Sequence, residues 1–271
     1  MPELPEVEFC ARKLRGWLDG RRIDAVEATP GRPLYDIDPV ALARALVGRR
    51  IEGIRRVGKQ IFVDTSGGQC LLVHLGMTGK WVPRVDGKRK HAHVSIRVDD
   101  GCWFDFLDPR KFGRVRLLPM GALATDPEVQ RIGPDALALS AQPRRLHPIL
   151  QRTKRAIKVA LLDQSLLAGV GNIYAAEALH RVRVDPRTPA HLLTPRKSAA
   201  LARALGAVMT ESLERETADE ITYLQEARAK NPFDVYGREG ESCTQCGGEI
   251  RRFVQQGRST FWCPRCQRPK T

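Results

Sequence analysis

The sequence lacks the features of membrane, exported and fibrous proteins. Among its 271 residues, no uncharged apolar run approaches the roughly 18 residues that a membrane span needs. Its start carries Glu3 and Glu6 and lacks the basic and then apolar order of a secretory signal peptide. Glycine and proline follow no period, and no internal repeat or low-complexity tract is visible. We therefore expect a cytoplasmic protein without a membrane partner, built as one large domain or two to three small ones.

Acidic residues are scarce relative to basic ones. The chain has 31 Asp and Glu against 45 Lys and Arg, which gives a formal net charge of +14 and a pI of ≈ 9.9. Such a surplus favours a polyanionic partner, most simply nucleic acid. A surface charge that only keeps the protein soluble explains the surplus equally well. With 42% hydrophobic residues the chain has enough apolar material for a core.

The seven cysteines fall into two groups. Cys10, Cys70 and Cys102 are isolated in apolar or strand-like segments, which predicts small buried side chains. The other four form two C-x-x-C pairs with sixteen residues between them: Cys243, Cys246, Cys263 and Cys266. This spacing predicts a zinc ribbon with four thiolate ligands, whose metal is structural because no position is left for water. Two disulfides are the alternative, and a cytoplasmic location disfavours them.

Hydrophobic periodicity divides the chain into a β-rich and a helical part. An amphipathic helix is predicted over 5–18 and a second helix over 40–46. Between residues 50 and 118 the runs have strand composition, and turns with glycine separate several of them: 50–57, 60–64, 70–75, 93–98, 102–106 and 114–118. This pattern predicts an antiparallel β-sandwich or barrel.

Beyond Pro119 the pattern becomes helical. Helices are predicted over 142–150, 155–162, 173–181 and 196–214. A tight turn with Gly169 and Gly171 precedes the third of these, and we expect Asn172 to cap that helix. Residues 215–240 are polar and poorly periodic, which predicts a linker or loop before the ribbon.

The first residues allow a specific chemistry. Removal of Met1 would expose Pro2 as a secondary amine, which has an unperturbed pKa of about 8 and is partly neutral at pH 7. Such an amine forms an iminium ion with an aldehyde-level carbon. Glu3 and Glu6, one helical turn apart, would be close enough to transfer protons. The alternative is that these residues only cap a helix, where Pro and Glu are ordinary.

A series of motifs resembles the formamidopyrimidine-DNA glycosylase family over nearly the whole chain. In order they are Met1–Glu8, Gly58-Lys59, His74–Gly79, Lys90–Val94, Asp108–Gly113, Ile157-Lys158, Leu161–Gln164, Gly169–Tyr174, Val235–Arg238 and Gly257–Thr260. The resemblance implies a DNA-repair enzyme that excises oxidised purines, such as 8-oxoguanine and formamidopyrimidines, and then cuts the strand by β,δ-elimination. It also implies an α+β fold. An antiparallel β-sandwich with an N-terminal helix would span 2–118, a helix–two-turns–helix domain 119–234, and a zinc finger 235–271.

The same resemblance implies roles for individual residues. Pro2 would attack C1′ of the damaged nucleotide, and Glu3 would donate and accept the proton that opens the sugar and helps to expel the base. Lys59 is similar to the family's proton donor for β-elimination, and Arg258 to its donor for δ-elimination. The damaged base must leave the duplex, and three residues are similar to those that fill the gap: Met77, Arg110 and Phe112.

The resemblance further implies how the protein holds its partner, damaged double-stranded DNA. Besides Lys59 and Arg258, the residues similar to the family's DNA contacts are His74, His91, Arg110, Lys154, Asn172 and Tyr236. The resemblance also implies one structural zinc ion and a monomeric protein.

Three departures from the family pattern leave the preferred base open. Lys111 stands where a second Arg is more common, Ala92 replaces the Asp between two histidines, and 216–232 lack the glycines and serines of the loop that closes over 8-oxoguanine. One alternative is the endonuclease VIII (Nei) branch, which excises oxidised pyrimidines; Leu4 and the complete gap-filling set disfavour it. Another is a protein that binds damaged DNA without catalysis.

Overall fold

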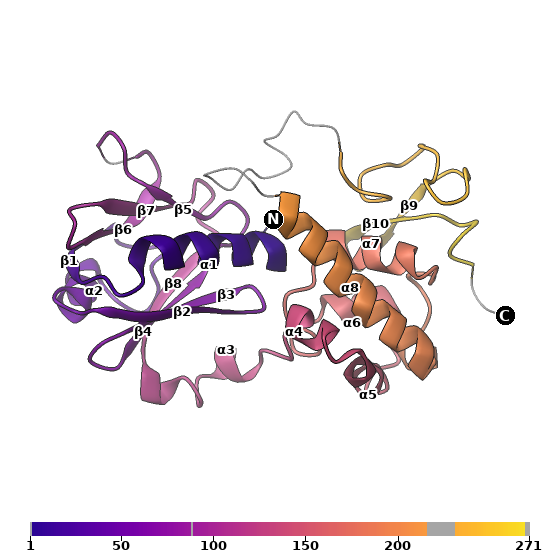
Figure 1. Ribbon diagram of the computed structural model, residues 1–271, viewed down its shortest axis with the longest axis horizontal. Coiled ribbons are helices and arrows are strands. Elements are labelled where there is room, and N and C mark those ends of the chain that lie inside the picture. Colours follow the sequence, from indigo (N-terminus) through magenta and orange to yellow (C-terminus); the bar gives the residue numbers. More distant parts are fainter. Residues whose placement is uncertain (1, 88, 216–230, 269–271) are drawn as a thin grey trace. The chain divides into compact units, whose positions relative to one another are not determined.

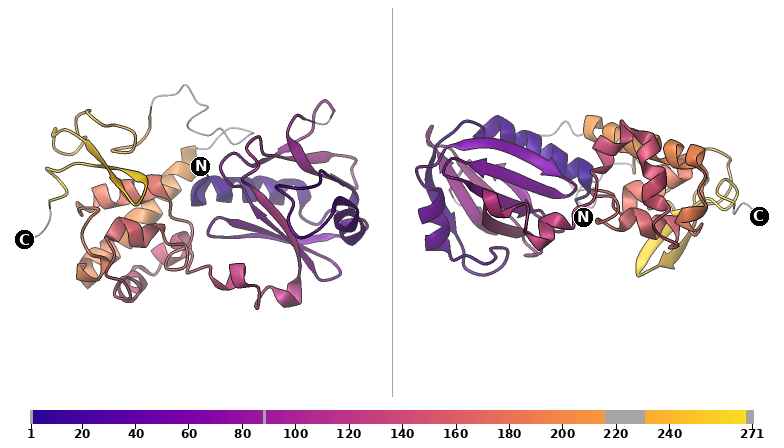
Figure 2. Two further views of the ribbon diagram at one scale, coloured as in Figure 1. Left: turned by 180° about the vertical axis from the view of Figure 1, so that it is seen from behind. Right: turned by 90° about the horizontal axis from the view of Figure 1, so that it is seen from below.

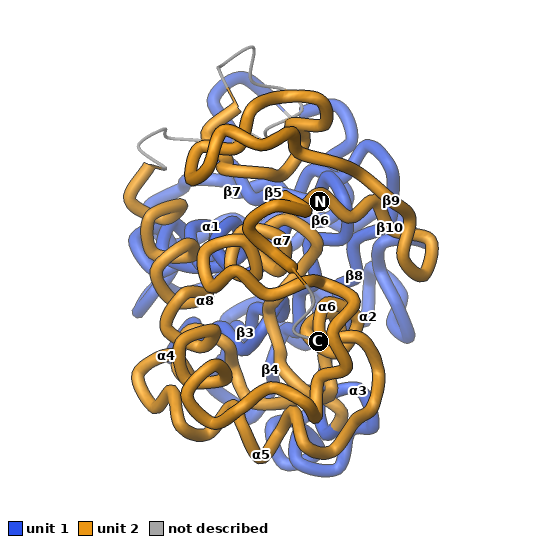
Figure 3. The backbone as a smooth tube through the Cα atoms, turned by 90° about the vertical axis from the view of Figure 1, so that its right-hand side faces the viewer, with its two compact units in different colours: residues 1–130, 216–223 blue, residues 131–215, 224–271 orange. Residues whose placement is uncertain are grey.

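The chain forms two compact units that divide after Gln130. The computed structural model describes residues 2–87, 89–215 and 231–268 (Figure 1). Within these, the first unit comprises residues up to 130, and the second comprises 131–215 and 231–268 (Figure 3). Met1, whose removal we expect, and the atypical segment 216–230 lie outside the described residues. No helix in the described part of the chain is long and apolar enough to span a bilayer.

The first unit consists of two four-stranded antiparallel sheets, which confirms the predicted sandwich. One sheet has the order β1-β6-β7-β5 and the other β2-β3-β4-β8. The strands are β1 (Ile23–Ala28), β2 (Ile51–Val57), β3 (Gln60–Thr65), β4 (Gln69–His74), β5 (Lys80–Pro83), β6 (Ala92–Val98), β7 (Trp103–Leu107) and β8 (Arg114–Pro119). The sequence did not predict β1 or β5, because the two acidic residues of β1 interrupt its apolar run without strict alternation, and β5 is only 4 residues long and ends in proline.

Two helices cover the edges of this sandwich. α1 (Leu4–Leu18) packs against β2 and β5, which are edge strands of different sheets, so it spans the opening between the two layers (Figures 1 and 2). α2 (Pro39–Leu46) packs against the edge strand β1. The start of α1 follows from its sequence, because the Glu6 carboxylate accepts the backbone N–H of Glu3 at 2.8 Å, as in a capping box.

The isolated cysteines do not share one environment. Cys10 and Cys70 are buried in the core, as predicted. The prediction was wrong for Cys102, which is exposed. It follows Gly101 in the turn before β7, where its backbone N–H donates to the Asp100 carboxylate at 2.9 Å. The turn conformation therefore decides its exposure rather than the apolar residues that follow.

The second unit is helical around the long α8 (Pro195–Arg215), which packs against α4 (Ala136–Ser140), α5 (Leu146–Leu150) and α7 (Asn172–Arg181). α3 (Pro127–Gln130) ends the first unit. The single helix predicted over 142–150 was wrong, because a 3-10 helix at Pro143–Arg145 precedes α5. A continuous helix over 142–150 would require Pro148 to donate an N–H to the Arg144 carbonyl, and proline has none; in the first turn of α5 no such bond is needed.

α6 (Ile157–Leu162) and α7 are joined by two tight turns. Gln164 folds this connection, since its amide donates to the Val170 carbonyl and accepts from the Gly169 N–H, both at 2.9 Å. Asn172 does not cap α7 as predicted. Gly171 occupies the cap position, and the Asn172 side chain instead donates to the Ser259 carbonyl at 2.9 Å.

The end of the described chain is a ribbon. β9 (Arg251–Gln255) and β10 (Arg258–Trp262) form an antiparallel hairpin, and β10 packs against α7. Ala176 of α7 belongs to the same buried cluster as Val235, Ile250 and two of the ribbon cysteines. The ribbon therefore shares its small core with a helix of the second unit.

Candidate active site and nucleic-acid interface

The predicted nucleophile and carboxylate lie directly before α1. Pro2 and Glu3 are both buried. The Glu6 carboxylate is engaged by the backbone of Glu3. Both carboxylates take part in the capping box at the start of α1, and Glu3 is the one adjacent to Pro2.

Lys59 lies in the tight turn between β2 and β3. Arg56, which is nearly buried, pairs with Glu8 of α1 at 2.8 Å and also donates to the Gly58 carbonyl at 3.0 Å. This ion pair is partly shielded from solvent, so it fixes the Gly58-Lys59 turn against the helix that begins after Pro2 and Glu3.

His74 ends β4 and is a neutral hydrogen-bond donor. Gly76 donates its N–H to His74 Nδ1 at 3.0 Å, so the ring proton sits on Nε2. Burial, reinforced by the positive charge of Lys59, lowers the pKa of His74 to about 4. At neutral pH the ring therefore offers a phosphate an N–H without a charge.

A buried carboxylate joins the loops that carry the three predicted gap-filling residues. Asp108 is fully buried, and it accepts from the Thr78 hydroxyl at 2.6 Å and from the Gly113 N–H at 2.6 Å. Thr78 follows Met77 in the loop after β4, and Gly113 closes the 108–113 loop between β7 and β8. Asp108 thus holds two loops together through one side chain.

These two loops approach more closely than a side chain would allow. Gly76 has φ +65°, and a Cβ there would collide with the backbone of Phe112 and Gly113. Phe112 is 48% exposed, and the Arg110 guanidinium lies 4.9 Å from the centre of its ring. The structure therefore brings the loop of Met77 to the loop of an exposed aromatic ring stacked with a cation.

Asp108 also positions His91. The backbone N–H of Asp108 donates to the His91 carbonyl at 3.1 Å, and the backbone carbonyl of Asp108 lies 3.0 Å from Nε2 of His93. Ala92, where the family more often has Asp, is buried and pairs with Leu107. His91 is exposed beside it. The backbone of Asp108 therefore supports His91 without a carboxylate at position 92.

The four ribbon cysteines form one candidate metal centre. Their sulfur atoms all lie within 4.8 Å of one another, with 3.9 Å between Cys243 and Cys266 and 3.5 Å between Cys246 and Cys263. A tetrahedral zinc ion with Zn–S bonds of about 2.3 Å requires sulfur separations of roughly 3.8 Å. The set fits one structural zinc ion and confirms the expected cofactor.

Two helices hold the strand that carries Arg258. Arg258 is exposed at the start of β10. The carbonyl of the next residue, Ser259, accepts from Lys158 of α6 at 3.1 Å and from Asn172 of α7 at 2.9 Å. Lys158 is 1% exposed and also donates to the Thr260 hydroxyl at 2.7 Å. In the sequence Lys158 is only a single cation within an apolar predicted helix, and we assigned no role to it.

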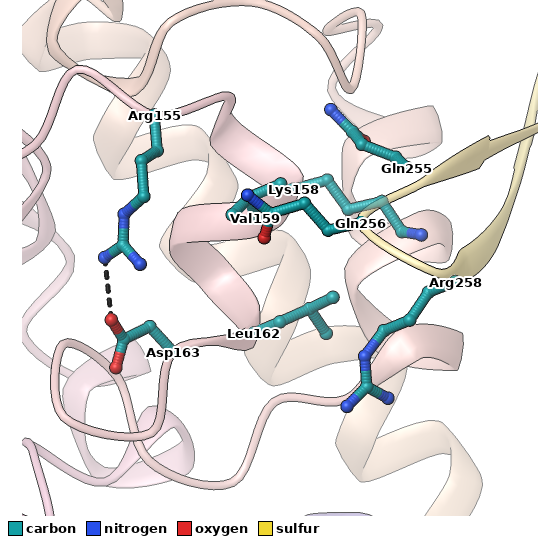
Figure 4. Close-up of a pocket in the computed structure, with 8 residues that line it drawn as sticks. All are labelled: Arg155, Lys158, Val159, Leu162, Asp163, Gln255, Gln256 and Arg258. Carbon is teal, nitrogen blue, oxygen red and sulfur yellow. Dashed lines mark hydrogen bonds and ion pairs between the residues drawn. The ribbon is translucent and has the colours of Figure 1, made fainter.

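A pocket of ≈ 230 Å³ lies between α6 and the ribbon hairpin. Figure 4 shows Arg155 paired with Asp163 on one side and Arg258 on the other, with Leu162 between them. Three of the lining residues are cations, and a phosphate group favours such a setting. Lys154 is exposed just before Arg155.

A second buried carboxylate positions Tyr236. Glu177 of α7 is 3% exposed and accepts the N–H groups of Asp234, Val235 and Tyr236 at 2.8, 3.0 and 2.9 Å. Burial raises the pKa of Glu177, and the three donors oppose this effect. The Tyr236 ring packs edge-on against Phe261 at 5.1 Å. Glu177 was missed in the sequence; its only signal was a carboxylate inside a predicted helix.

Three family models match successive parts of the chain. They are the formamidopyrimidine-DNA glycosylase N-terminal domain at residues 1–115, the H2TH domain at 132–223, and the zinc finger found in FPG and IleRS at 240–269. A formamidopyrimidine-DNA glycosylase of Rhodopseudomonas palustris is 37% identical over 297 residues, covering 99% of this chain and 100% of the relative. The chain belongs to the formamidopyrimidine-DNA glycosylase family. That of Novosphingobium aromaticivorans is 38% identical over 278 residues, with the same coverage.

Solved structures of the family agree with the fold. The MutM (FPG) protein of Thermus thermophilus has a TM-score of 0.81 and 36% identity, covering 98% of both chains. Lactococcus lactis Fpg in complex with DNA containing an abasic site has a TM-score of 0.84 and 28% identity, covering 98% of this chain and 100% of that one. The protein is therefore a DNA glycosylase with DNA as its partner, and AP-lyase activity is typical of its family.

The neutral state of His74 predicts a pH-dependent stability. Between pH 6.5 and about 4 the unfolded chain binds a proton at this residue and the folded chain does not, so stability falls as the pH falls. His74→Asn keeps an acceptor for Gly76 and removes the titrating group. When the pH is lowered from 7.5 to 5, we expect the free energy of unfolding of wild type to fall by up to about 2 kcal/mol more than that of the variant. Urea unfolding at the two pH values measures this difference. Equal losses would contradict this prediction.

Removing the Asp108 carboxylate should loosen both loops. Asp108→Ala leaves the Gly113 N–H without its acceptor and should lower the free energy of unfolding by about 1–3 kcal/mol. Asp108→Asn should be milder, since its amide still accepts from Gly113 and donates to Thr78. Urea unfolding and hydrogen exchange at the Gly113 amide measure these effects. Asp86→Ala, in an exposed turn, is the control and should change little; if all three variants match wild type, Asp108 does not hold the loops.

The metal centre predicts a local effect of removing one ligand. Cys243→Ser should abolish zinc binding, unfold the ribbon and displace Arg258, which weakens DNA binding. The first unit should remain folded. Elemental analysis reports the zinc, and the indole NMR signals separate Trp262 on β10 from Trp81 and Trp103 in the first unit. Cys102→Ser, at an exposed cysteine, should keep the zinc. Full DNA affinity without metal would overturn the prediction.

Proposed function

We propose that this enzyme excises oxidised purines, formamidopyrimidines and 8-oxoguanine, from double-stranded DNA and then cleaves the strand by β,δ-elimination. The observation that carries the proposal is the position of Pro2 and Glu3, a buried imino acid and a buried carboxylate directly before α1. Support for the substrate comes from solved complexes of similar proteins, which include Lactococcus lactis Fpg with FAPY-dG DNA and MutM with carbocyclic 8-oxo-G DNA.

In this proposal Pro2 is the nucleophile. Once Met1 is removed, the nitrogen of Pro2 is a secondary amine. Burial and the positive end of α1 both disfavour its protonated form. The nitrogen bonds to C1′ of the nucleotide. The bond from C1′ to the base breaks, and the base leaves with that electron pair and a proton. Glu3 then takes the proton from the Pro2 nitrogen and gives a proton to O4′ as the C1′–O4′ bond breaks, which opens the sugar and leaves an iminium ion between Pro2 and C1′.

The iminium ion then drives strand cleavage. It acidifies the hydrogen on C2′, and loss of that proton expels the 3′ phosphate; a second elimination expels the 5′ phosphate. Each departing phosphate carries negative charge that a nearby cation stabilises. We assign Lys59 to the first elimination and Arg258 to the second. The ion pair of Arg56 and Glu8, which holds the Lys59 turn against α1, supports the first assignment.

Eversion of the damaged base leaves a gap in the duplex, and we propose that Met77, Arg110 and Phe112 fill it. Phe112 is an exposed flat ring that suits insertion between base steps. Arg110 stacks on that ring and offers donors to the partner base. The rigid link through Asp108 supports this role, since a wedge that yields would not keep the base out of the stack.

The remaining predicted DNA contacts fall in both units. We propose that His74 and His91 bind phosphates from the first unit, and Lys154, Asn172 and Tyr236 from the second. The domains would be 2–118 for catalysis, 119–234 for DNA binding and 235–271 for the zinc finger. We further propose that the protein acts as a monomer in the cytoplasm, at the chromosomal DNA and without a membrane partner.

The proposal predicts covalent trapping. Borohydride should reduce the iminium ion and link the protein to duplex DNA that carries 8-oxoguanine opposite C. Pro2→Gly, or an N-terminal extension that leaves the Pro2 nitrogen as an amide, should abolish the trapped band on a denaturing gel. Mass spectrometry should place the adduct on the N-terminal peptide of wild type.

The outcome on other substrates separates the alternatives. Trapping on thymine glycol without trapping on 8-oxoguanine would replace the proposed substrate by oxidised pyrimidines, as in the Nei branch. Binding to damaged DNA without any trapping would indicate a non-catalytic protein. Pro2-independent trapping would show that another amine is the nucleophile.

A further inference from the structure

A histidine outside the ribbon contacts one of its cysteines. His180 lies near the end of α7 and is fully buried. Its Nε2 is 3.3 Å from Sγ of Cys243, within the distance of a hydrogen bond to sulfur. The two residues are 63 positions apart in sequence. The contact therefore connects a helix of the second unit directly to the zinc centre.

The surroundings of the ring determine which nitrogen carries the proton. Within the part of the chain that the structure describes, His180 Nδ1 is buried and has no hydrogen-bond partner. A proton on Nδ1 would leave a buried N–H unsatisfied and would turn the lone pair of Nε2 toward the sulfur. A proton on Nε2 avoids both penalties and points at Cys243. The ring is therefore a donor to the sulfur.

Such a donor matters because four thiolates around one divalent cation carry a net charge of −2. His180 brings a side-chain donor to Cys243, which is buried against α7. A hydrogen bond to a ligand from outside the first coordination sphere orients that ligand and tunes its bond to the metal.

We propose that His180 is an outer-sphere ligand of the zinc centre. Its Nε2–H donates to the Cys243 thiolate, slows the loss of zinc, lowers the reactivity of that sulfur and ties the ribbon to α7. The proposal concerns the metal centre and holds whichever base the enzyme excises. It makes His180 a positioning residue, since it would act through Cys243 and not touch the DNA.

Two substitutions separate hydrogen bonding from packing. His180→Phe keeps a ring of similar shape and removes the donor, whereas His180→Gln keeps an N–H donor at the position of Nε2. In zinc-loaded full-length protein we expect His180→Phe to lose zinc to a chromogenic chelator 10- to 100-fold faster than wild type, in line with the usual cost of removing an outer-sphere partner. His180→Gln should stay within a few-fold of wild type. His147→Phe, whose ring contacts Ser198 and no cysteine, is the control and should match wild type.

Alkylation of the thiolates gives an independent measure. Iodoacetamide should modify Cys243 faster in His180→Phe than in wild type, with no change at the exposed Cys102. The proposal is overturned if His180→Phe releases zinc at the wild-type rate. It is also overturned if the Phe and Gln variants lose zinc equally fast, because packing alone would then account for the effect.

A measurement on wild type keeps the proposal testable if His180→Phe does not fold. Long-range ¹H–¹⁵N NMR of the zinc-loaded protein distinguishes the two histidine tautomers. We expect the proton of His180 on Nε2. A ring protonated only on Nδ1 would have no donor facing Cys243 and would refute the proposal.

Discussion

The carboxylate of Asp108 is fully buried, and the positions of three other side chains depend on where it lies. It accepts hydrogen bonds from Thr78 and Gly113, and its backbone donates to the carbonyl of His91. A charge in such a place is tolerated only when its lone pairs are satisfied. The loops that satisfy it therefore cannot move independently. Met77, Phe112 and His91 extend from one rigid edge of the sandwich rather than from three separate loops.

The second unit uses the same principle with other groups. Glu177 gathers three consecutive backbone N–H groups and thereby fixes Tyr236. Lys158 and Asn172 share the carbonyl of Ser259, the residue that follows Arg258. In each case a buried polar side chain holds the backbone at, or next to, a residue to which we assign a DNA contact. The protein's own hydrogen bonds therefore restrain the residues of the proposed contacts.

Much of the fold was readable in the sequence because it depends on local patterns. Strand composition with glycine turns predicted six of the eight strands of the sandwich, and the capping residues Glu3 and Glu6 mark where α1 begins. The paired C-x-x-C motifs predicted a four-sulfur cluster, which the distances bear out. The errors have two causes: a local turn at Gly101 exposes Cys102, and a long-range hydrogen bond to Ser259 engages the Asn172 side chain that was expected to cap α7.

The sequence by itself determined the family, the order of the structural segments and the residue types available for chemistry, since motifs and periodicity are properties of neighbouring residues. Only the tertiary structure decided which buried groups position the others. Asp108, Glu177 and His180 meet their partners across gaps of 30, 57 to 59 and 63 residues, respectively. No periodicity encodes such a pairing, because a buried polar group finds its partner through the packing of whole elements and not through its neighbours in the chain.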